Sequence, residues 1–125
     1  MRYISALAFA LIVAALCPIA RSSAQAASEC PATGTMSDWG VNSTGYFTVA
    51  SGGSCLFPVR MQGTVSSSQI SQRPAHGTLK KLSVSTYQYT AKAGYKGPDT
   101  FAVSFTGKGP TGHGTSVITM TATVQ

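Results

Sequence analysis

Residues 87–105 decide the fold, and they read YQYTAKAGYKGPDTFAVSF. The large apolar residues of 101–105 alternate with small or polar ones, which is the period-two pattern of a β-strand with one buried face. Tyr87 and Tyr89 show the same spacing, so a second strand is predicted before it. The glycines and the proline between the two strands favour a sharp turn. The stretch therefore predicts a strand, a tight corner and a strand.

Five residues form the predicted structural corner: Gly94, Tyr95, Gly97, Asp99 and Phe101. The two glycines permit the sharp bend. Asp99 is predicted to accept hydrogen bonds from nearby loop amides just before the strand. Tyr95 is predicted to lay its ring on the core and to use its hydroxyl on a backbone group, as the tyrosine corner of sandwich folds does.

Three patterns occur together here: Pro-x-His-Gly at residues 74–77, Tyr-x-Tyr at 87–89 and Gly-Tyr-x-Gly-x-Asp-x-Phe at 94–101. With these patterns the chain resembles the bacterial Ig-like/cadherin-like repeat domain over roughly residues 70–124. The resemblance implies a sandwich fold in an exported or surface protein, where such domains are mostly spacers and binding modules. Family members usually carry an acidic turn after the Phe-rich strand, whereas residues 106–109 are Thr-Gly-Lys-Gly. The resemblance therefore does not extend to a calcium site.

Residues 1–26 have the pattern of a cleavable secretory signal peptide. Arg2 supplies the positive charge, residues 4–16 form an apolar run, and Ala-Gln-Ala at 24–26 offers a cleavage site. A membrane anchor is the alternative, but the run is shorter than the roughly 20 residues that a spanning helix needs, and Pro18 follows it. We therefore expect an exported protein, periplasmic or secreted, without a stable membrane anchor after cleavage.

Cleavage would leave about 99 residues, which suits one domain with a single core. Seven lysines and arginines would remain with all three acids, so the net charge would be 7 − 3 = +4. This surplus attracts anionic partners without specificity. The basic residues are scattered and are not interleaved with aromatic ones, so specific nucleic-acid binding is not predicted.

Cys30 and Cys55 are the two cysteines after the signal, and an oxidising compartment favours a disulfide between them. The bridge would close a loop of about 26 residues, worth on the order of 3.5 kcal/mol. A catalytic or redox pair is the alternative, but there is no C-x-x-C and no adjacent histidine. The bridge is expected to tie an N-terminal arm, residues 27–44, onto a sandwich domain, residues 45–125. Trp39 is expected to pack under this arm, with a ligand platform as the alternative.

Short strands joined by turns rich in glycine, serine and proline are predicted for the rest of the chain. Residues 46–50, 55–61 and 116–124 each alternate apolar and polar side chains. Pro58 cannot donate to a β-ladder, so its strand is predicted to lie at a sheet edge. A change of phase predicts a bulge near Ser85. About seven such strands predict an all-β fold, an Ig-like antiparallel β-sandwich.

Catalytic, metal and cofactor sites find little support in the sequence. Residues 107–112 match G-x-G-x-x-G, but the dinucleotide motif needs a helix to follow, and here a threonine-rich strand predicts a hairpin loop. His76 and His113 are the only histidines, fewer than the three or four ligands of a usual metal site. Three acids in all, and no G-x-S-x-G elbow, indicate a noncatalytic protein without a cofactor.

The sequence thus predicts an exported, noncatalytic Ig-like binding or structural module, whose partner is an anionic envelope polysaccharide or a protein. The contact surface is predicted at the loop of residues 107–114, with Lys108 and His113, followed by Lys92 and Lys96 of the preceding turn. Two alternatives stay open. One is a small secreted enzyme inhibitor that acts through its loops, and the other is a metal-handling protein that uses both histidines.

Overall fold

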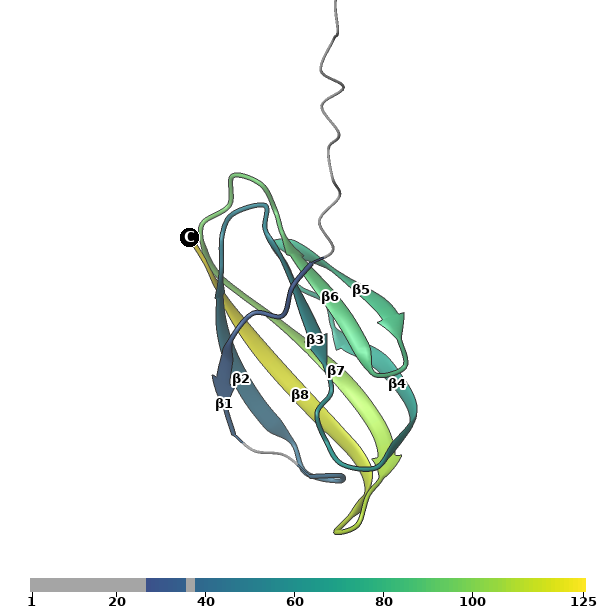
Figure 1. The fold of residues 1–125 in the computed structure, drawn as a ribbon. Coiled ribbons are helices and arrows are strands. Elements are labelled where there is room, and N and C mark those ends of the chain that lie inside the picture. The colour runs from purple at the N-terminus through teal and green to yellow at the C-terminus, as the bar shows by residue number, and fades with distance from the viewer. Residues whose placement is uncertain (1–26, 36–37) are drawn as a thin grey trace, which may run out of the picture.

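The computed structural model describes residues 27–35 and 38–125, and these form two β-sheets that pack face to face (Figure 1). The larger sheet has the order β1-β2-β8-β7-β4, with β1 (Ala32–Gly34), β2 (Ser43–Val49), β8 (His113–Val124), β7 (Gly97–Lys108) and β4 (Thr64–Gln72). The smaller sheet has the order β3-β6-β5, with β3 (Ser54–Pro58), β6 (Thr86–Ala91) and β5 (Gly77–Ser83). The predicted all-β, two-sheet fold is confirmed. The predicted signal peptide, residues 1–26, lies outside the described residues.

Strands β2 and β8 run parallel, with Ser43 opposite Ile118 and Val49 opposite Val124. The prediction of a wholly antiparallel sandwich is therefore wrong for this pair. Alternation in the sequence indicates which face a strand buries, but it does not indicate the direction of the neighbouring strand. The described residues form eight strands, not about seven, because residues 32–34 add an edge strand antiparallel to β2.

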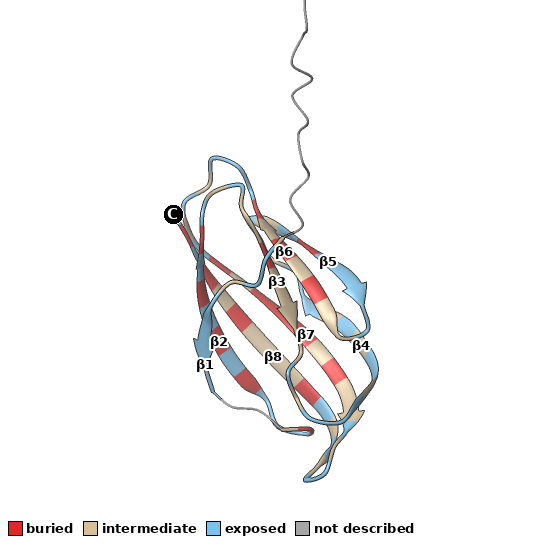
Figure 2. Ribbon diagram, in the orientation of Figure 1, coloured by how far each residue is buried: buried red, intermediate tan, exposed pale blue. Residues whose placement is uncertain are grey.

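Buried side chains alternate along the central strands, as the sequence predicts (Figure 2). On β7 the buried residues include Phe101, Val103 and Phe105, and on β6 they include Tyr87 and Tyr89. The rings of Tyr89 and Phe101 stack with their centroids 5.3 Å apart, so the two sheets meet through aromatic side chains. Full burial of each such side chain contributes roughly 1.5–3 kcal/mol, which makes this cluster a major part of the hydrophobic stabilisation.

Asp99 is a buried acceptor with 4% of its surface exposed. Its Oδ1 accepts hydrogen bonds from the backbone amides of Ala75, at 3.0 Å, and His76, at 3.2 Å. Its Oδ2 accepts one from the Tyr89 hydroxyl at 2.6 Å. The prediction that Asp99 fastens the corner by accepting loop amides is confirmed. Three donors offset the cost of removing this carboxyl group from water.

The Tyr95 hydroxyl donates a hydrogen bond to the backbone carbonyl three residues later, at 2.6 Å, which confirms its predicted use of a backbone group. Its ring stacks on that of His76, with the centroids 4.0 Å apart. Gly94 and Gly97 have φ angles of 86° and 132°, which favour glycine. Gly97 and Asp99 lie within β7 and not before it, because β7 pairs with β8 from its first residue.

The change of phase near Ser85, which predicted a bulge, is caused by a hairpin turn. Strand β5 ends at Ser83 and β6 begins at Thr86, so the two residues between them form the turn. A register shift does occur in this hairpin, but it lies between Lys81 and Ser83. The prediction is wrong because a chain reversal and a bulge change the phase of the apolar residues in the same way.

The disulfide between Cys30 and Cys55 is present, with the two Cα atoms 5.3 Å apart. It joins the segment before β1 to β3, which is an edge strand of the smaller sheet. That position confirms the interpretation of Pro58, the last residue of β3. Trp39 is 3% exposed and its Nε1 donates to the carbonyl of Gln62 at 2.9 Å, so it packs in the core as expected.

Candidate functional site

A groove opens on one side of the sandwich because the two sheets differ in width. The five-stranded sheet extends past the three-stranded one, so β3 does not cover the inner faces of β1, β2 and the neighbouring part of β8. The resulting cavity has a volume of about 470 Å³. Small-molecule sites span roughly 300–1,000 Å³, so the groove is large enough for a ligand.

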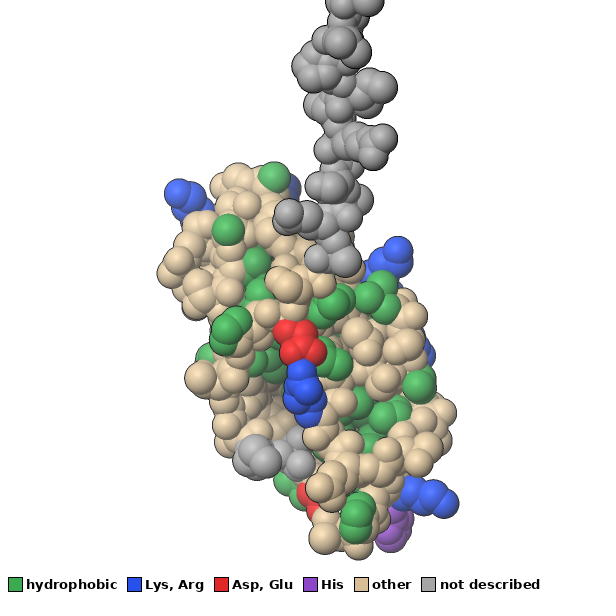
Figure 3. Space-filling view, viewed as in Figure 1, with side chains coloured by type: hydrophobic (Ala, Val, Ile, Leu, Met, Phe, Trp, Pro, Cys, Tyr) green, Lys and Arg blue, Asp and Glu red, His purple; other side chains and the backbone are tan. Residues whose placement is uncertain are grey.

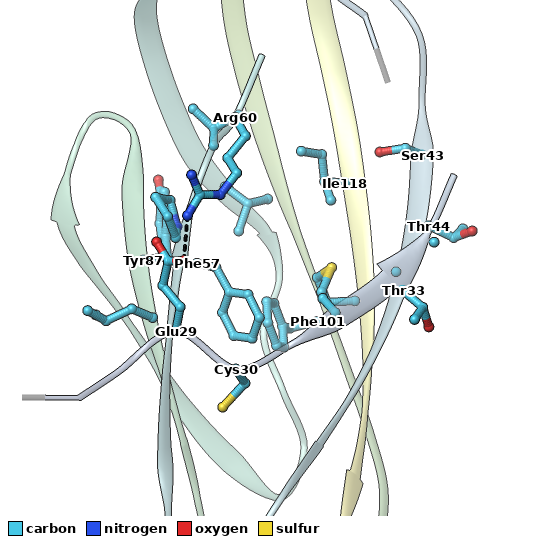
Figure 4. A pocket seen from close by; sticks show the side chains of 18 of the residues that line it. Glu29, Cys30, Thr33, Ser43, Thr44, Phe57, Arg60, Tyr87, Phe101 and Ile118 are labelled. Atoms are coloured by element: carbon cyan, nitrogen blue, oxygen red, sulfur yellow. Dashed lines mark hydrogen bonds and ion pairs between the residues drawn. The ribbon is translucent and has the colours of Figure 1, made fainter. Parts of the chain in front are cut away.

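Apolar side chains form the floor of the groove. Strands β7 and β8 contribute Val103, Phe105, Ile118 and Met120 from their inward positions, and β3 contributes Phe57 from the facing sheet. Figure 4 shows the rings and aliphatic side chains gathered between the two walls. Figure 3, viewed as Figure 1, shows hydrophobic side chains in green exposed among the polar ones on this face of the molecule. This floor favours an apolar ligand surface.

Gly45 helps to shape the β2 wall of the groove. A Cβ atom at this position would lie 2.6 Å from the sulfur of Met120, which is closer than real contacts allow. The missing side chain therefore lets Met120 lie across β2. A larger residue at position 45 would push Met120 into the groove and reduce the space for a ligand.

A strap of residues 28–31 closes one end of the groove. The amide of Leu56 donates to the carbonyl of Ser28 at 3.0 Å, and Glu29 forms an isolated parallel bridge with Leu56. The disulfide of Cys30 then anchors the strap to β3. Figure 4 places Cys30 at one end of the groove and Arg60 toward the other. The strap follows the edge of β3 and then crosses to β1, so the groove has a closed end and an open end.

An ion pair lies along the β3 wall at the mouth of the groove, where Nη2 of Arg60 donates to Oε2 of Glu29 (Figure 4). The side chains are 72% and 49% exposed, respectively. Exposed ion pairs of this kind contribute about 0–1 kcal/mol. The pair can therefore open at little cost, and it does not seal the groove.

Ser43 supplies a hydroxyl on the opposite wall, at the start of β2. The residue is 7% exposed, and Figure 4 shows its hydroxyl directed away from β2 into the groove. Among the described residues no side-chain hydrogen bond involves this hydroxyl, and no fully buried polar atom lacks a partner, so the Ser43 hydroxyl is one that solvent in the groove reaches. It is therefore available to a ligand.

The predicted contact residues do not come together. Lys92 and Lys96 lie in the β6–β7 turn, whereas Lys108 and His113 face each other across the β7–β8 hairpin. These turns lie at opposite ends of β7, which is twelve residues long (Figure 1). A strand of that length spans on the order of 35 Å. The hairpin confirms the interpretation of G-x-G-x-x-G as a loop, but the four side chains form two separate groups.

The two histidines are also far apart. The amide of His76 binds Asp99 near the first residues of β7, and His113 pairs with Lys108 at its last residue. At the rise of a β-strand this is a separation of about 30 Å. No group of three His, Cys, Asp or Glu side chains in the described ranges could hold a metal ion. The alternative in which both histidines share one metal ion is therefore wrong.

Two ionisable groups outside the groove have shifted pKa values that reflect structural hydrogen bonds. The pKa of Asp38 is lowered because the Thr111 hydroxyl and the Trp39 amide donate to its carboxylate. The pKa of Tyr89 is raised by burial, with a further contribution from its hydrogen bond to Asp99. Both arrangements fasten turns to the sandwich.

Sequence reasoning missed the groove and its polar residues. It placed Phe57 on an inward-facing parity, but it gave no role to Ser43, Glu29 or Arg60. Arg60 and Glu29 are 31 positions apart, and nothing in their local patterns indicates that they meet. The site exists because the two sheets differ in width, and no local sequence pattern predicts how many strands each sheet contains.

Comparison with known proteins gives no match: neither a model of a protein family nor a curated protein sequence matches this chain. In the part of the chain that the structure describes, no helix has the length and apolar character to cross a membrane.

Proposed function

We propose that this protein is an exported, noncatalytic Ig-like module that binds its ligand in the groove between the two sheets. The groove carries the proposal, since it is a concave, mainly apolar cavity with a few polar groups at its mouth. That combination is typical of small-molecule binding sites. The ligand belongs to the cell envelope or the extracellular space, the compartments to which the signal pattern points.

The Ig-like assignment is supported by the corner residues. The Tyr95 hydroxyl bonds to a backbone carbonyl, and Asp99 accepts two loop amides, as expected of a sandwich corner. The disulfide of Cys30 and Cys55 agrees with export to an oxidising compartment, and it anchors the strap that bounds the groove.

The noncatalytic assignment is supported by the charged groups at the groove. Of the described residues that line it, the charged side chains are Glu29 and Arg60, which pair with each other. Neither His76 nor His113 is among the residues that line the groove together with Ser43. The hydroxyl therefore lacks the adjacent base that a serine nucleophile requires.

The experiment is a fluorescence titration of the exported protein with 1-anilinonaphthalene-8-sulfonate, an apolar probe. Ser43→Phe should fill the mouth of the groove and weaken probe binding at least tenfold. The matched control is Thr48→Phe, which places the same ring on the exposed face of β2 outside the groove and should bind like the wild type. Absence of binding to the wild type, or equal losses in both variants, would contradict the proposed site.

A further inference from the structure

The groove has different chemistry along its length. Its floor is formed by aliphatic and aromatic side chains, such as Phe57, Val103 and Ile118, whereas its polar groups lie on the walls and at the mouth. The strap that contains Cys30 closes the far end. This distribution suits a ligand with a long apolar part that lies on the floor and one polar end that stays at the mouth.

Arg60 determines which charge a ligand group needs in order to bind at the mouth of the groove. A guanidinium group has five N–H donors in a planar fork that matches a carboxylate or a phosphate. In the described residues, the side-chain hydrogen bond of Arg60 is the one from Nη2 to Glu29. Its other donors are open to a ligand, and the positive surplus of the chain favours an anion.

Glu29 shows where such an anion binds. Its carboxylate lies against Arg60 at the mouth, so it stands in the place that the carboxylate of a ligand would take (Figure 4). A ligand carboxylate must displace it, and displacement costs little because the pair is exposed. Glu29 is thus a competitor for the site, and its removal should strengthen ligand binding.

Ser43 adds a second polar contact on the β2 wall. Its hydroxyl points into the groove and is available as a donor. In the β2–β8 pairing it lies opposite Ile118, which Figure 4 shows toward the same end of the groove as Arg60 but nearer to Ser43. A headgroup bound to Arg60 at the open end would therefore have a neutral donor on the other wall.

We propose that the groove binds a single-chain amphiphile with a carboxylate headgroup, the chain on the apolar floor and the headgroup at Arg60. This inference rests on the proposed function, because it names the ligand class of the same groove. The headgroup displaces the Glu29 carboxylate from its ion pair with Arg60.

The test is calorimetric titration of the exported protein with dodecanoate and with dodecanol, which have the same chain but different headgroups. Dodecanoate should bind at least tenfold more tightly than dodecanol. Arg60→Gln should abolish this preference, and Glu29→Gln should tighten dodecanoate binding severalfold. Arg73→Gln is the matched control, because Arg73 follows β4 on the other side of the sandwich, and it should leave both affinities unchanged. Decanoate should bind roughly tenfold more weakly than dodecanoate, because it has two fewer methylenes to bury.

Several results would overturn the inference. Equal binding of the two amphiphiles, or a preference for dodecanoate that survives in Arg60→Gln, would exclude recognition of a carboxylate headgroup by Arg60. If the apolar probe still binds in that case, the proposed function stands and only the ligand class is wrong. If neither amphiphile nor the apolar probe binds, the proposed function fails as well. A dimer in solution that excludes dodecanoate would show that a second copy covers the groove, and this also overturns the inference.

Discussion

The two sides of this sandwich are closed by different means. On the β4–β5 side, the chain passes directly from one sheet to the other through residues 73–76. Nζ of Lys81 donates to the backbone carbonyl of Ser68 at 2.8 Å, and the Tyr87 hydroxyl donates to the hydroxyl of Ser68 at 2.9 Å. Buried Asp99 fastens the connecting loop. Hydrogen bonds and a short connection thus seal this side.

On the β1–β3 side the chain passes between the sheets through residues 50–53, and the strap of residues 28–31 spans the rest of this side. The strap is joined to β3 and the residues that follow it by one disulfide, one backbone hydrogen bond and one exposed ion pair, and the groove lies beside it. One side of the sandwich is therefore held by hydrogen bonds between the sheets, and the other side offers the larger space for a ligand. The β4–β5 side has a smaller hollow of about 250 Å³ beside residues 75–78, whereas the strapped side keeps a larger apolar surface uncovered at the expense of packing.

Removal of the disulfide should have the largest effect on stability. The Cys30→Ala/Cys55→Ala double variant should lose about 3.5 kcal/mol of unfolding free energy, because the denatured chain regains the freedom of a loop with a sequence separation of 25 residues. Urea unfolding of the two proteins measures the loss. A loss below about 1 kcal/mol would mean that other contacts hold the strap, and the contrast between the sides would weaken.

Asp99→Ala should have the next largest effect, and it acts on the sealed side. The variant leaves the amides of Ala75 and His76 without their acceptor, and we expect a loss of about 3 kcal/mol in urea unfolding. Asp99→Asn is the matched control, since its amide oxygen can still accept both hydrogen bonds. It should lose clearly less, and equal losses in both variants would argue that the negative charge matters more than the acceptor.

Tyr89→Phe should have a smaller effect that depends on pH. Because burial raises the pKa of Tyr89 in the folded protein, its contribution to stability is complete below the ordinary tyrosine pKa of about 10 and is lost as pH rises above it. At pH 7 the variant should lose about 1 kcal/mol with the hydrogen bond to Asp99. Unfolding measured from pH 8 to pH 11 should fall more steeply in the wild type, and parallel curves would contradict the assignment.

Glu29→Gln should change stability least. Its ion pair with Arg60 is exposed, so the unfolding free energy should change by less than about 1 kcal/mol. Differential scanning calorimetry of the variant against the wild type is sufficient to measure this. A large loss of unfolding free energy would show that the ion pair stabilises the strap. A ligand carboxylate could then not displace Glu29 at little cost.

The sequence by itself determined the features that depend on neighbouring residues. Period-two alternation specified the inward side chains of β7, and a carboxylate beside a turn specified the acceptor role of Asp99. Residues 27–125 contain two cysteines, which left one possible disulfide within that part of the chain. These predictions succeeded because pleat geometry and turn chemistry act over a few residues.

Only the tertiary structure decided the parallel pairing of β2 with β8 and the groove that follows from the unequal sheets. It also brought Glu29 to Arg60 across 31 positions and turned the Ser43 hydroxyl toward the same cavity. Alternation encodes the buried face of a strand, but neither its partner nor its direction. Partner and direction depend on contacts between segments far apart in the sequence, and the candidate site therefore exists only in the assembled fold.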